Sequence, residues 1–416
     1  MRRRKERFEE FDWHVLAVAL VLSLIGCVFV WSTTIGQETG RFPLVARQVA
    51  YIGVSMPLIA VLVRVPYPSL ARMSVPAYGI ALLTLVALLV WGAARRETRG
   101  WVQLPLGFSL QPAEFTKLAV ILMLAAYLRF RGPPTRWRDL LGPFALAGIP
   151  MVLIAKQPDL GGAITLVPVL IAMVLVAGAP IARLLSLFVL VAVVGVGFYY
   201  SPLIKDYQRA RIDAFFESIP EKTAEAQAYR AAGDHKNARK AEQELSVIKR
   251  QSNFQVYHAM ISIGSGGLTG QHIGKGKHNR LGFLPERHND FIFAVIGEEW
   301  GFVGSSIVLW LSYLLITLIF LIAGRTRDAF GRLLCVGVGT WLGAQTFINT
   351  GVATGLLPVT GLTLPFLSAG GSSMVASFLG VAVVLNVGAH RVTALDGYSF
   401  DRGGFAYGEP SGRRRR

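Results

Sequence analysis

Long apolar runs alternate with polar connections over most of this chain. A helix that crosses the hydrocarbon core of a bilayer needs about 20 predominantly apolar residues. Runs of that kind lie roughly at residues 13–32, 47–63, 74–91, 112–130, 140–155, 162–179, 182–200, 292–323, 330–350 and 371–388. The pattern predicts an all-α polytopic membrane protein, with about ten transmembrane helices forming one domain over residues 1–416.

The polar connections differ in length, and the long ones are at 92–111, 201–291 and 351–370. The longest is rich in Glu, Lys, Ala, Arg and Gln between about 218 and 251, which favours a helical insertion outside the bilayer. A solvated surface insertion and a partner-binding element both fit this composition. Residues 389–416 are expected to form a cytoplasmic tail.

Composition and charge support a membrane protein and suggest its orientation. The chain is 53% hydrophobic and 16% charged, with a mean hydropathy of +0.48, which is too apolar for an ordinary soluble enzyme. The net charge is +17, but the arginines lie in short loops and at the ends of the chain, so they favour membrane orientation over nucleic-acid binding. An even number of spans puts both termini on one side, and the arginine distribution predicts that this side is the cytoplasm. The N-terminal run lacks a clear small-residue cleavage site and is expected to stay as an anchor.

One predicted external loop does not fit this orientation, because it carries Arg95, Arg96 and Arg99. A basic loop on the outside can contact an anionic substrate. The chain has no P-loop and no strand followed by GxGxxG, so a nucleotide-binding module is not expected. A substrate that is already activated and arrives within the membrane would not need one.

Ionisable residues occur where the outer ends of the predicted helices should lie. A charge there costs roughly 2.5 to 3.5 kcal/mol on insertion scales, so function is the default hypothesis. Glu114 and Lys117 are three residues apart and share a helix face, so they could pair with each other or serve a site. Lys156 and Asp159 flank Pro158, and irregular backbone at that depth is tolerated where it is buried in protein or lines a wet cavity.

The stretch LPERHNDFIFAVIGEEWG begins at residue 284 and places several ionisable groups directly before an apolar run. Asp290 is partly shielded by the apolar residues 291–293, which would raise its pKa toward the range of a general base. An N-cap of the following helix is an equally good interpretation. Arg287 and His288 could tune Asp290 or bind phosphate, whereas Glu298 and Glu299 are expected to be structural.

The segment GLTLPFLSAGGSSM, residues 361–374, offers the hydroxyls of Ser368, Ser372 and Ser373 at the start of a helix. Such a helix N-terminus favours anions such as pyrophosphate, although close helix packing explains its small residues equally well. The histidines lack the spacing of a zinc site.

Five motifs occur in the order QPAEFTKLA, KQPDLGGA, IGSGGLTG, LPERHNDFIFAVIGEE and PFLSAGGSSM. In this order they resemble the SEDS family of bacterial shape, elongation, division and sporulation proteins, over nearly the whole chain. The ERH before Asn289 is more similar to the rod-shape elongation branch, RodA, than to the division branch, FtsW. The chain departs from the family pattern between Phe216 and Ser252, within the charged insertion.

The resemblance implies a peptidoglycan glycosyltransferase in the bacterial cytoplasmic membrane that polymerises lipid II on the extracytoplasmic side during elongation. It also implies a class B penicillin-binding protein transpeptidase and other elongation-complex membrane proteins as partners. The family's essential acidic residue carries over to Asp290. Its other polar positions match Glu114, Lys117 and Asp159, and its basic-aromatic loop motif matches residues 99–101.

The mechanism expected on these grounds is an inverting transfer. Asp290 would take the proton of the acceptor GlcNAc 4-hydroxyl as its oxygen attacks the anomeric carbon of the growing strand, and lipid pyrophosphate would leave. Basic side chains or a divalent cation could stabilise the leaving group, and no other cofactor is expected. The residues expected to contact substrate are Arg99, Trp101, Glu114, Lys117, Lys156, Asp159, Arg287, His288, Ser368 and Ser372.

Three alternatives stay open. A flippase for a lipid-linked precursor would also need a polar cavity between helices. A scaffold that only recruits the transpeptidase would not need Asp290, and a division or sporulation member would differ only in its cellular role. The clustering of informative residues toward the external ends, without an obvious inverted repeat, favours the enzyme.

Overall fold

The computed structural model describes residues 12–35, 42–91, 93–95, 98–103, 109–186, 253–282, 284 and 286–390, with scattered positions between 224 and 241. The span expected at 182–200, the insertion at 218–251 and the tail after residue 390 lie largely outside these ranges. Every other predicted span corresponds to a described helix.

The described chain is mainly helical, as predicted. Its helices are α2 (Trp13–Thr33), α3 (Phe42–Arg64), α4 (Tyr67–Trp91), α5 (Pro112–Arg131), α6 (Trp137–Lys156), α7 (Leu160–Val176), α12 (Asn253–Ser265), α13 (Lys277–Leu281), α14 (Ile292–Arg325), α15 (Ala329–Ala353) and α16 (Gly371–Ala389). Within the described residues, six helices are long and apolar enough to cross a membrane: α2, α3, α4, α6, α14 and α16. A multi-pass helical membrane protein is therefore confirmed, whereas the total of ten spans stays a prediction.

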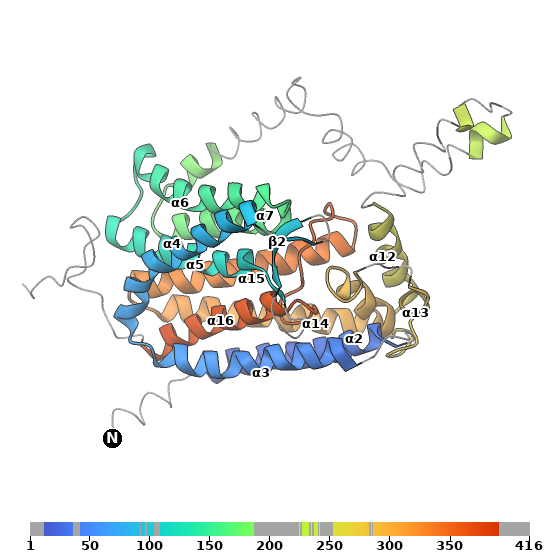
Figure 1. The fold of residues 1–416 in the computed structure, drawn as a ribbon, viewed down its shortest axis with the longest axis horizontal. Helices are drawn as coiled ribbons and strands as arrows, with labels where there is room; N and C mark the ends of the chain where they lie inside the picture. Colours follow the sequence, from blue (N-terminus) through green and yellow to red (C-terminus); the bar gives the residue numbers. More distant parts are fainter. Residues whose placement is uncertain are drawn as a thin grey trace, which may run out of the picture.

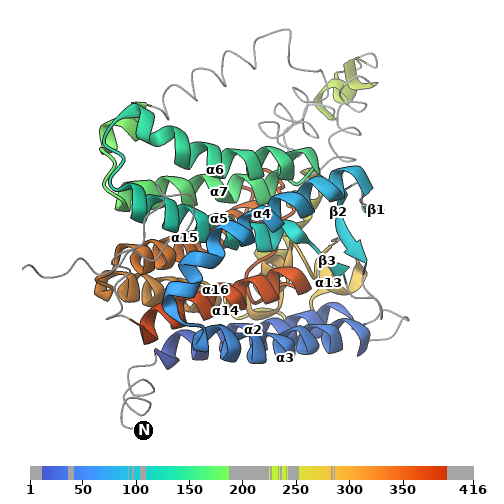
Figure 2. The ribbon, with the colours of Figure 1, turned by 60° about the vertical axis from the view of Figure 1, so that its left-hand side comes forward.

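Most helices run along the long axis of the molecule (Figure 1). Helix α15 lies at the centre and contacts α14, α5, α7 and α16. Helices α6 and α7 lie on one side of the bundle and α2 and α3 on the other (Figure 2). Trp341 and Phe330 of α15 are fully buried, while apolar residues such as Leu83 and Leu141 are exposed on outer helices. An apolar outer surface of this kind suits contact with lipid.

The prediction of an all-α chain misses a small antiparallel sheet in the connection between α4 and α5. Its strands are β1 (Ala93–Arg95), β2 (Thr98–Gln103) and β3 (Ser109–Leu110), in the order β1-β2-β3. Strand β2 contains Thr, Trp and Val, which favour strands. The strands are too short to give a clear alternating pattern. The sheet lies at the same end of the bundle as α13 (Figure 2).

The span predicted as continuous over 292–323 is interrupted at Gly301, where φ is 66° and ψ is −162°. The amide of Phe302 donates to the carbonyl of Gly267 at 2.8 Å, and the amide of Val303 donates to the carbonyl of Leu268 at 3.1 Å. A neighbouring glycine-rich turn therefore satisfies amides that the interruption leaves without helical partners, as an apolar environment requires. The interruption makes residues 292–300 a short half-helix directly after Asp290.

Candidate functional site

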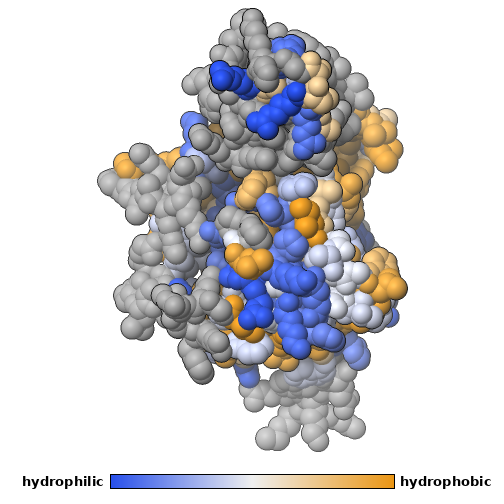
Figure 3. Space-filling view, turned by 90° about the vertical axis from the view of Figure 1, so that its right-hand side faces the viewer, coloured by the Kyte–Doolittle hydropathy of each residue, from blue (hydrophilic) through white to orange (hydrophobic). Residues whose placement is uncertain are grey.

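A cavity of about 370 Å³ opens at the end of the bundle that carries the sheet. Its walls come from the first turns of α3, the sheet, the turn between α6 and α7, residues 288–290, and the stretch from 360 to 374. Figure 3 views this end of the molecule, where hydrophilic residues gather over the middle. Of the residues predicted to form a site, the lining includes Trp101, Asp159, His288, Asp290, Ser368 and Ser372.

Asp290 is half-buried and lines this cavity. Its Oδ2 lies beside Gly361, where an added Cβ would be 3.9 Å away. The N-cap of α14 is Phe291, so Asp290 lies one residue before the capping position. The position of the cap therefore does not support the helix-cap interpretation of Asp290.

The backbone around Asp290 is fixed by bonds to its own segment and to the C-terminal region. The amides of Asn289 and Asp290 both donate to the carbonyl of Glu286, which closes a tight turn. Ala369 donates its amide to the carbonyl of residue 288 at 2.9 Å. The hydroxyl of Ser368 donates to the carbonyl of residue 289 at 2.6 Å. Ser368, expected to bind substrate, is therefore engaged in holding this segment.

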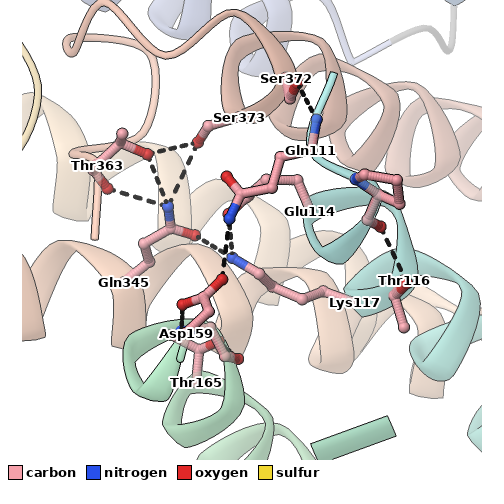
Figure 4. Close-up of polar contacts among 12 residues, drawn as sticks. Gln111, Glu114, Thr116, Lys117, Asp159, Thr165, Gln345, Thr363, Ser372 and Ser373 are labelled. Atoms are coloured by element: carbon pink, nitrogen blue, oxygen red, sulfur yellow. Dashed lines mark hydrogen bonds and ion pairs between the residues drawn. The ribbon is translucent and has the colours of Figure 1, made fainter. Parts of the chain in front are cut away.

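A polar layer lies directly beneath the cavity. Lys117 and Glu114 Oε1 form a buried ion pair at 2.7 Å, which confirms that the two residues pair with each other. Lys117 also donates to Gln345 Oε1 at 3.5 Å, and Gln345 donates to the carbonyl of Thr363 at 3.0 Å and to Ser373 at 3.4 Å. Figure 4 shows Gln345 between Lys117 and Thr363. Because Thr363 and Ser373 line the cavity, the hydrogen bonds of Gln345 connect the buried ion pair to the cavity wall.

Asp159 lines the cavity and also caps α7. Its Oδ1 accepts from the amide of Gly162 at 2.8 Å, and its Oδ2 accepts from Gln111 Nε2 at 2.9 Å. Burial raises the pKa of Asp159, and the bonds from Gly162 and Gln111 offset part of that rise. Ser372 accepts from the amide of Gln111 at 2.8 Å, which ties the sheet connection to the start of α16.

Two other predicted contact residues are not among the described lining residues. Lys156 is exposed at the last residue of α6 and is outside the cavity lining, which the following turn supplies instead through Gln157, Pro158 and Asp159. Arg99 belongs to β2, but its side chain is outside the described part of the structure.

Arg287 is buried and donates to the carbonyl of Asn279, so it belongs to a polar network around α14 and not to the cavity lining. Asn279 also donates its amide to Glu298 at 3.1 Å and its side chain to Glu299 at 2.8 Å. Burial lowers the pKa of Arg287, and the two carboxylates counteract this. Glu298 and Glu299 are fully buried, and Glu299 also accepts from Ser32 at 2.5 Å, which confirms the expected structural contacts.

Sequence reasoning missed several cavity residues. Arg47, Gln48 and Tyr51 of α3 line the cavity, as do Thr360 and Thr363. Arg47 could have been found, because it is a charged residue at the outer end of a predicted span. The others carry no charge that would single them out. Within the described residues, no three His, Cys, Asp or Glu side chains are grouped so that they could hold a metal ion.

Comparisons with known proteins agree on one family. The cell cycle protein family FtsW/RodA/SpoVE has a model that matches residues 12–393. The probable peptidoglycan glycosyltransferase FtsW of Geobacter metallireducens is 32% identical over 391 residues, covering 92% of this chain and 96% of the relative. The peptidoglycan glycosyltransferase MrdB of Escherichia coli K12 is 31% identical over 380 residues, covering 91% and 94%.

Solved structures give the same result. The rod shape determining protein RodA of Thermus thermophilus has a TM-score of 0.63 and 29% identity, covering 92% of this chain and 98% of that one. A chain from a structure described as showing coordination of polymerization and crosslinking by a peptidoglycan synthase complex has a TM-score of 0.72 and 29% identity, covering 92% and 99%.

Proposed function

This chain belongs to the FtsW/RodA/SpoVE family of cell cycle proteins, and from this premise we propose that it is a peptidoglycan glycosyltransferase that polymerises lipid II into glycan strands. The observation that carries the proposal is the carboxylate of Asp290 in a polar cavity at one end of a membrane bundle. Curated relatives named as peptidoglycan glycosyltransferases cover nearly the whole chain.

In the proposed reaction, Asp290 accepts the proton of the acceptor 4-hydroxyl as that oxygen forms a bond to the anomeric carbon of the donor. The bond between this carbon and the lipid pyrophosphate breaks, and the pyrophosphate leaves with the electron pair. Attack from the face opposite an α-linked leaving group gives a β-linkage with inversion. The leaving group carries the energy, so no nucleotide site is needed.

The departing pyrophosphate needs positive charge nearby. Among the described lining residues, Arg47 and His288 are the basic side chains. Lys117 is paired beneath the cavity, and Arg287 lies in the network around Glu298 and Glu299. This arrangement supports Arg47 and His288, alone or with a divalent cation, as the groups that meet the phosphates.

The test uses purified protein with its penicillin-binding protein partner and labelled lipid II in detergent. Wild type is expected to make glycan polymer, and Asp290→Asn is expected to make none while it still binds the partner, because an amide cannot take the proton. If wild type makes no polymer where the partner is active, the proposal fails. Full activity in Asp290→Asn would make Asp290 a structural residue.

We also propose that the chain lies in the bacterial cytoplasmic membrane with its cavity outside and works with a class B penicillin-binding protein. The related chain from a peptidoglycan synthase complex supports such a partner. The alternative, a lipid II flippase, predicts translocation of labelled lipid II in proteoliposomes that Asp290→Asn does not affect.

Elongation is the cellular role favoured by the ERH at residues 286–288, whereas relatives named FtsW favour division. Depletion in the source bacterium separates the two roles. Loss of an elongation enzyme should give rounded cells, and loss of a division enzyme should give filaments.

A further inference from the structure

Asn349 of α15 is 1% exposed and is not part of the cavity lining. Its side-chain amide donates to the carbonyl of Asp290 at 2.8 Å and to the carbonyl of Leu362 at 2.6 Å. A primary amide has two hydrogens to donate, and both are used here. Its Oδ1 is buried and accepts no hydrogen bond from the described residues, so this side chain is engaged through its donors.

These two bonds join segments on either side of the Asp290 carboxylate. Asp290 is 59 residues from Asn349 in sequence, and Leu362 is 13 residues away. Leu362 directly follows Gly361, the residue beside Asp290 Oδ2. Asn349 therefore fixes the backbone that carries the carboxylate relative to the backbone that the carboxylate lies against.

The helix that carries Asn349 is well suited to serve as a reference point. Helix α15 contacts four other long helices, and Trp341 and Leu342 of the same helix are almost fully buried. A rotamer held by packing and by hydrogen bonds places the groups bound to it within a narrow range of positions. The segment from 286 to 290 is a turn that Ser368 and Ala369 also hold, and the bond from Asn349 ties it to a buried helix.

We infer that Asn349 is a positioning residue, which holds Asp290 so that its carboxylate faces the acceptor hydroxyl in the cavity. The inference rests on the proposed glycosyltransferase function and names a residue that acts through Asp290. Removing the amide should leave substrate binding nearly intact and slow the chemical step, because a small misplacement of a reacting group is enough to do so.

The chain supplies a matched control in Asn386 of α16. Asn386 is fully buried, donates to the carbonyls of Leu62 and Val65 at 2.8 and 2.9 Å, and also leaves its Oδ1 without a partner among the described residues. These carbonyls lie at the end of α3 opposite the cavity. Asn349→Ala and Asn386→Ala therefore remove the same group from the same kind of contact, and only one of them adjoins Asp290.

The experiment measures kcat and KM for lipid II on the folded fraction of each variant in complex with the partner. Asn349→Ala is expected to lower kcat by about 10²-fold with KM nearly unchanged, and Asn386→Ala is expected to keep the wild-type kcat. Equal kcat losses in both variants, or none in Asn349→Ala, would overturn the inference. If wild type itself makes no polymer, the proposed function fails instead.

Asn349→Asp provides a second variant, with nearly the same shape, in case the alanine variant does not fold. An ionised Asp has no hydrogen to donate, whereas a protonated Asp has one. The ratio of its kcat to that of wild type should therefore fall as the pH rises. A ratio of one at every pH would show that the amide donors do not position Asp290.

Discussion

At the scale of single residues, the ion pair of Lys117 and Glu114 has two roles to separate, one in the stability of the bundle and one in the arrangement of the cavity. Both side chains are buried, and Lys117 also contacts Gln345 and lies 5.6 Å from the ring centroid of Trp341. A pair buried in this way need not stabilise the fold more than apolar residues would. Its connection through Gln345 to Thr363 provides a route by which it could organise the cavity floor.

Truncating one partner tests these two roles. Lys117→Met leaves Glu114 buried without its counter-charge and should reduce the free energy of unfolding by about 3–5 kcal/mol. The double variant Lys117→Met with Glu114→Leu should regain much of that loss, because no charge remains buried. The midpoint of thermal unfolding in detergent measures both effects.

Polymerisation by the double variant then separates structure from chemistry. If the pair only stabilises the bundle, activity should return with stability. If the pair organises the cavity for substrate, the double variant should be stable and inactive. A double variant less stable than Lys117→Met would contradict the argument from buried charge.

At the scale of elements, the interruption of α14 at Gly301 sets the direction of the half-helix that follows Asp290. The φ of 66° with ψ of −162° is open only to glycine, and a Cβ there would lie 2.4 Å from the amide nitrogen of Gly270. The glycine-rich turn at 266–270 and Gly301 therefore form one joint. A side chain on Gly270 or on Gly301 would force the backbone of the turn away from the backbone of α14.

Gly301→Ala should be strongly destabilising. The backbone conformation alone is expected to cost about 1–3 kcal/mol, and the overlap with Gly270 adds to that. Gly324→Ala in the same helix is the control, since no atom lies within 4 Å of its added Cβ. Gly324→Ala should raise the free energy of unfolding by no more than about 1 kcal/mol, because alanine favours a helix more than glycine does. Equal unfolding midpoints for the two variants would show that the joint tolerates a side chain.

How well each of these elements could be predicted depends on the length of its pattern in the sequence. The long described helices could be predicted because each lies on a run of about 20 mainly apolar residues, which is an unambiguous pattern. Helices α12 and α13, with 13 and 5 residues, matched no predicted span. The sheet could not, because β3 has two residues and β1 has three. The interruption at Gly301 was hidden because glycine is common in membrane helices and the run stays apolar on both sides.

The site shows the same division between strong and weak signals. Asp290, Asp159 and His288 were found because charged or polar groups stand out beside apolar runs. Arg287 and Lys156 stood out equally and lie elsewhere, since a sequence does not show which way a side chain turns. Asn349 was missed because an uncharged amide within a helix has no distinguishing pattern, and its contacts depend on the packing of α15.

At the scale of the whole molecule, the two ends of the bundle differ in their loops, although both carry exposed basic residues, which include Lys275, Lys277 and Arg280 at the cavity end. The cavity, the sheet, α12 and α13 lie at one end, and exposed arginines mark the other, at Arg64, Arg72, Arg131, Arg325 and Arg327. Cytoplasmic loops carry an excess of basic residues. This distribution supports an orientation with the arginine-rich end in the cytoplasm and the cavity outside.

Accessibility of single cysteines to a membrane-impermeant thiol reagent tests that orientation. Leu281 lies near the cavity end, in α13, and is 69% exposed, whereas Arg327 is exposed between α14 and α15. Leu281→Cys and Arg327→Cys would each be made in a chain whose native Cys27 and Cys335 are replaced by alanine. Cys335 is buried and Cys27 is half-buried, so these replacements change little of the surface.

In intact spheroplasts, Leu281→Cys should react and Arg327→Cys should not, because the bilayer separates the reagent from the arginine-rich end. After permeabilisation both should react, which controls for steric access. The reverse pattern would put the cavity in the cytoplasm, where an activated lipid-linked substrate would be polymerised before export. The orientation thus decides whether this cavity can build a wall directly on the outer face of the membrane.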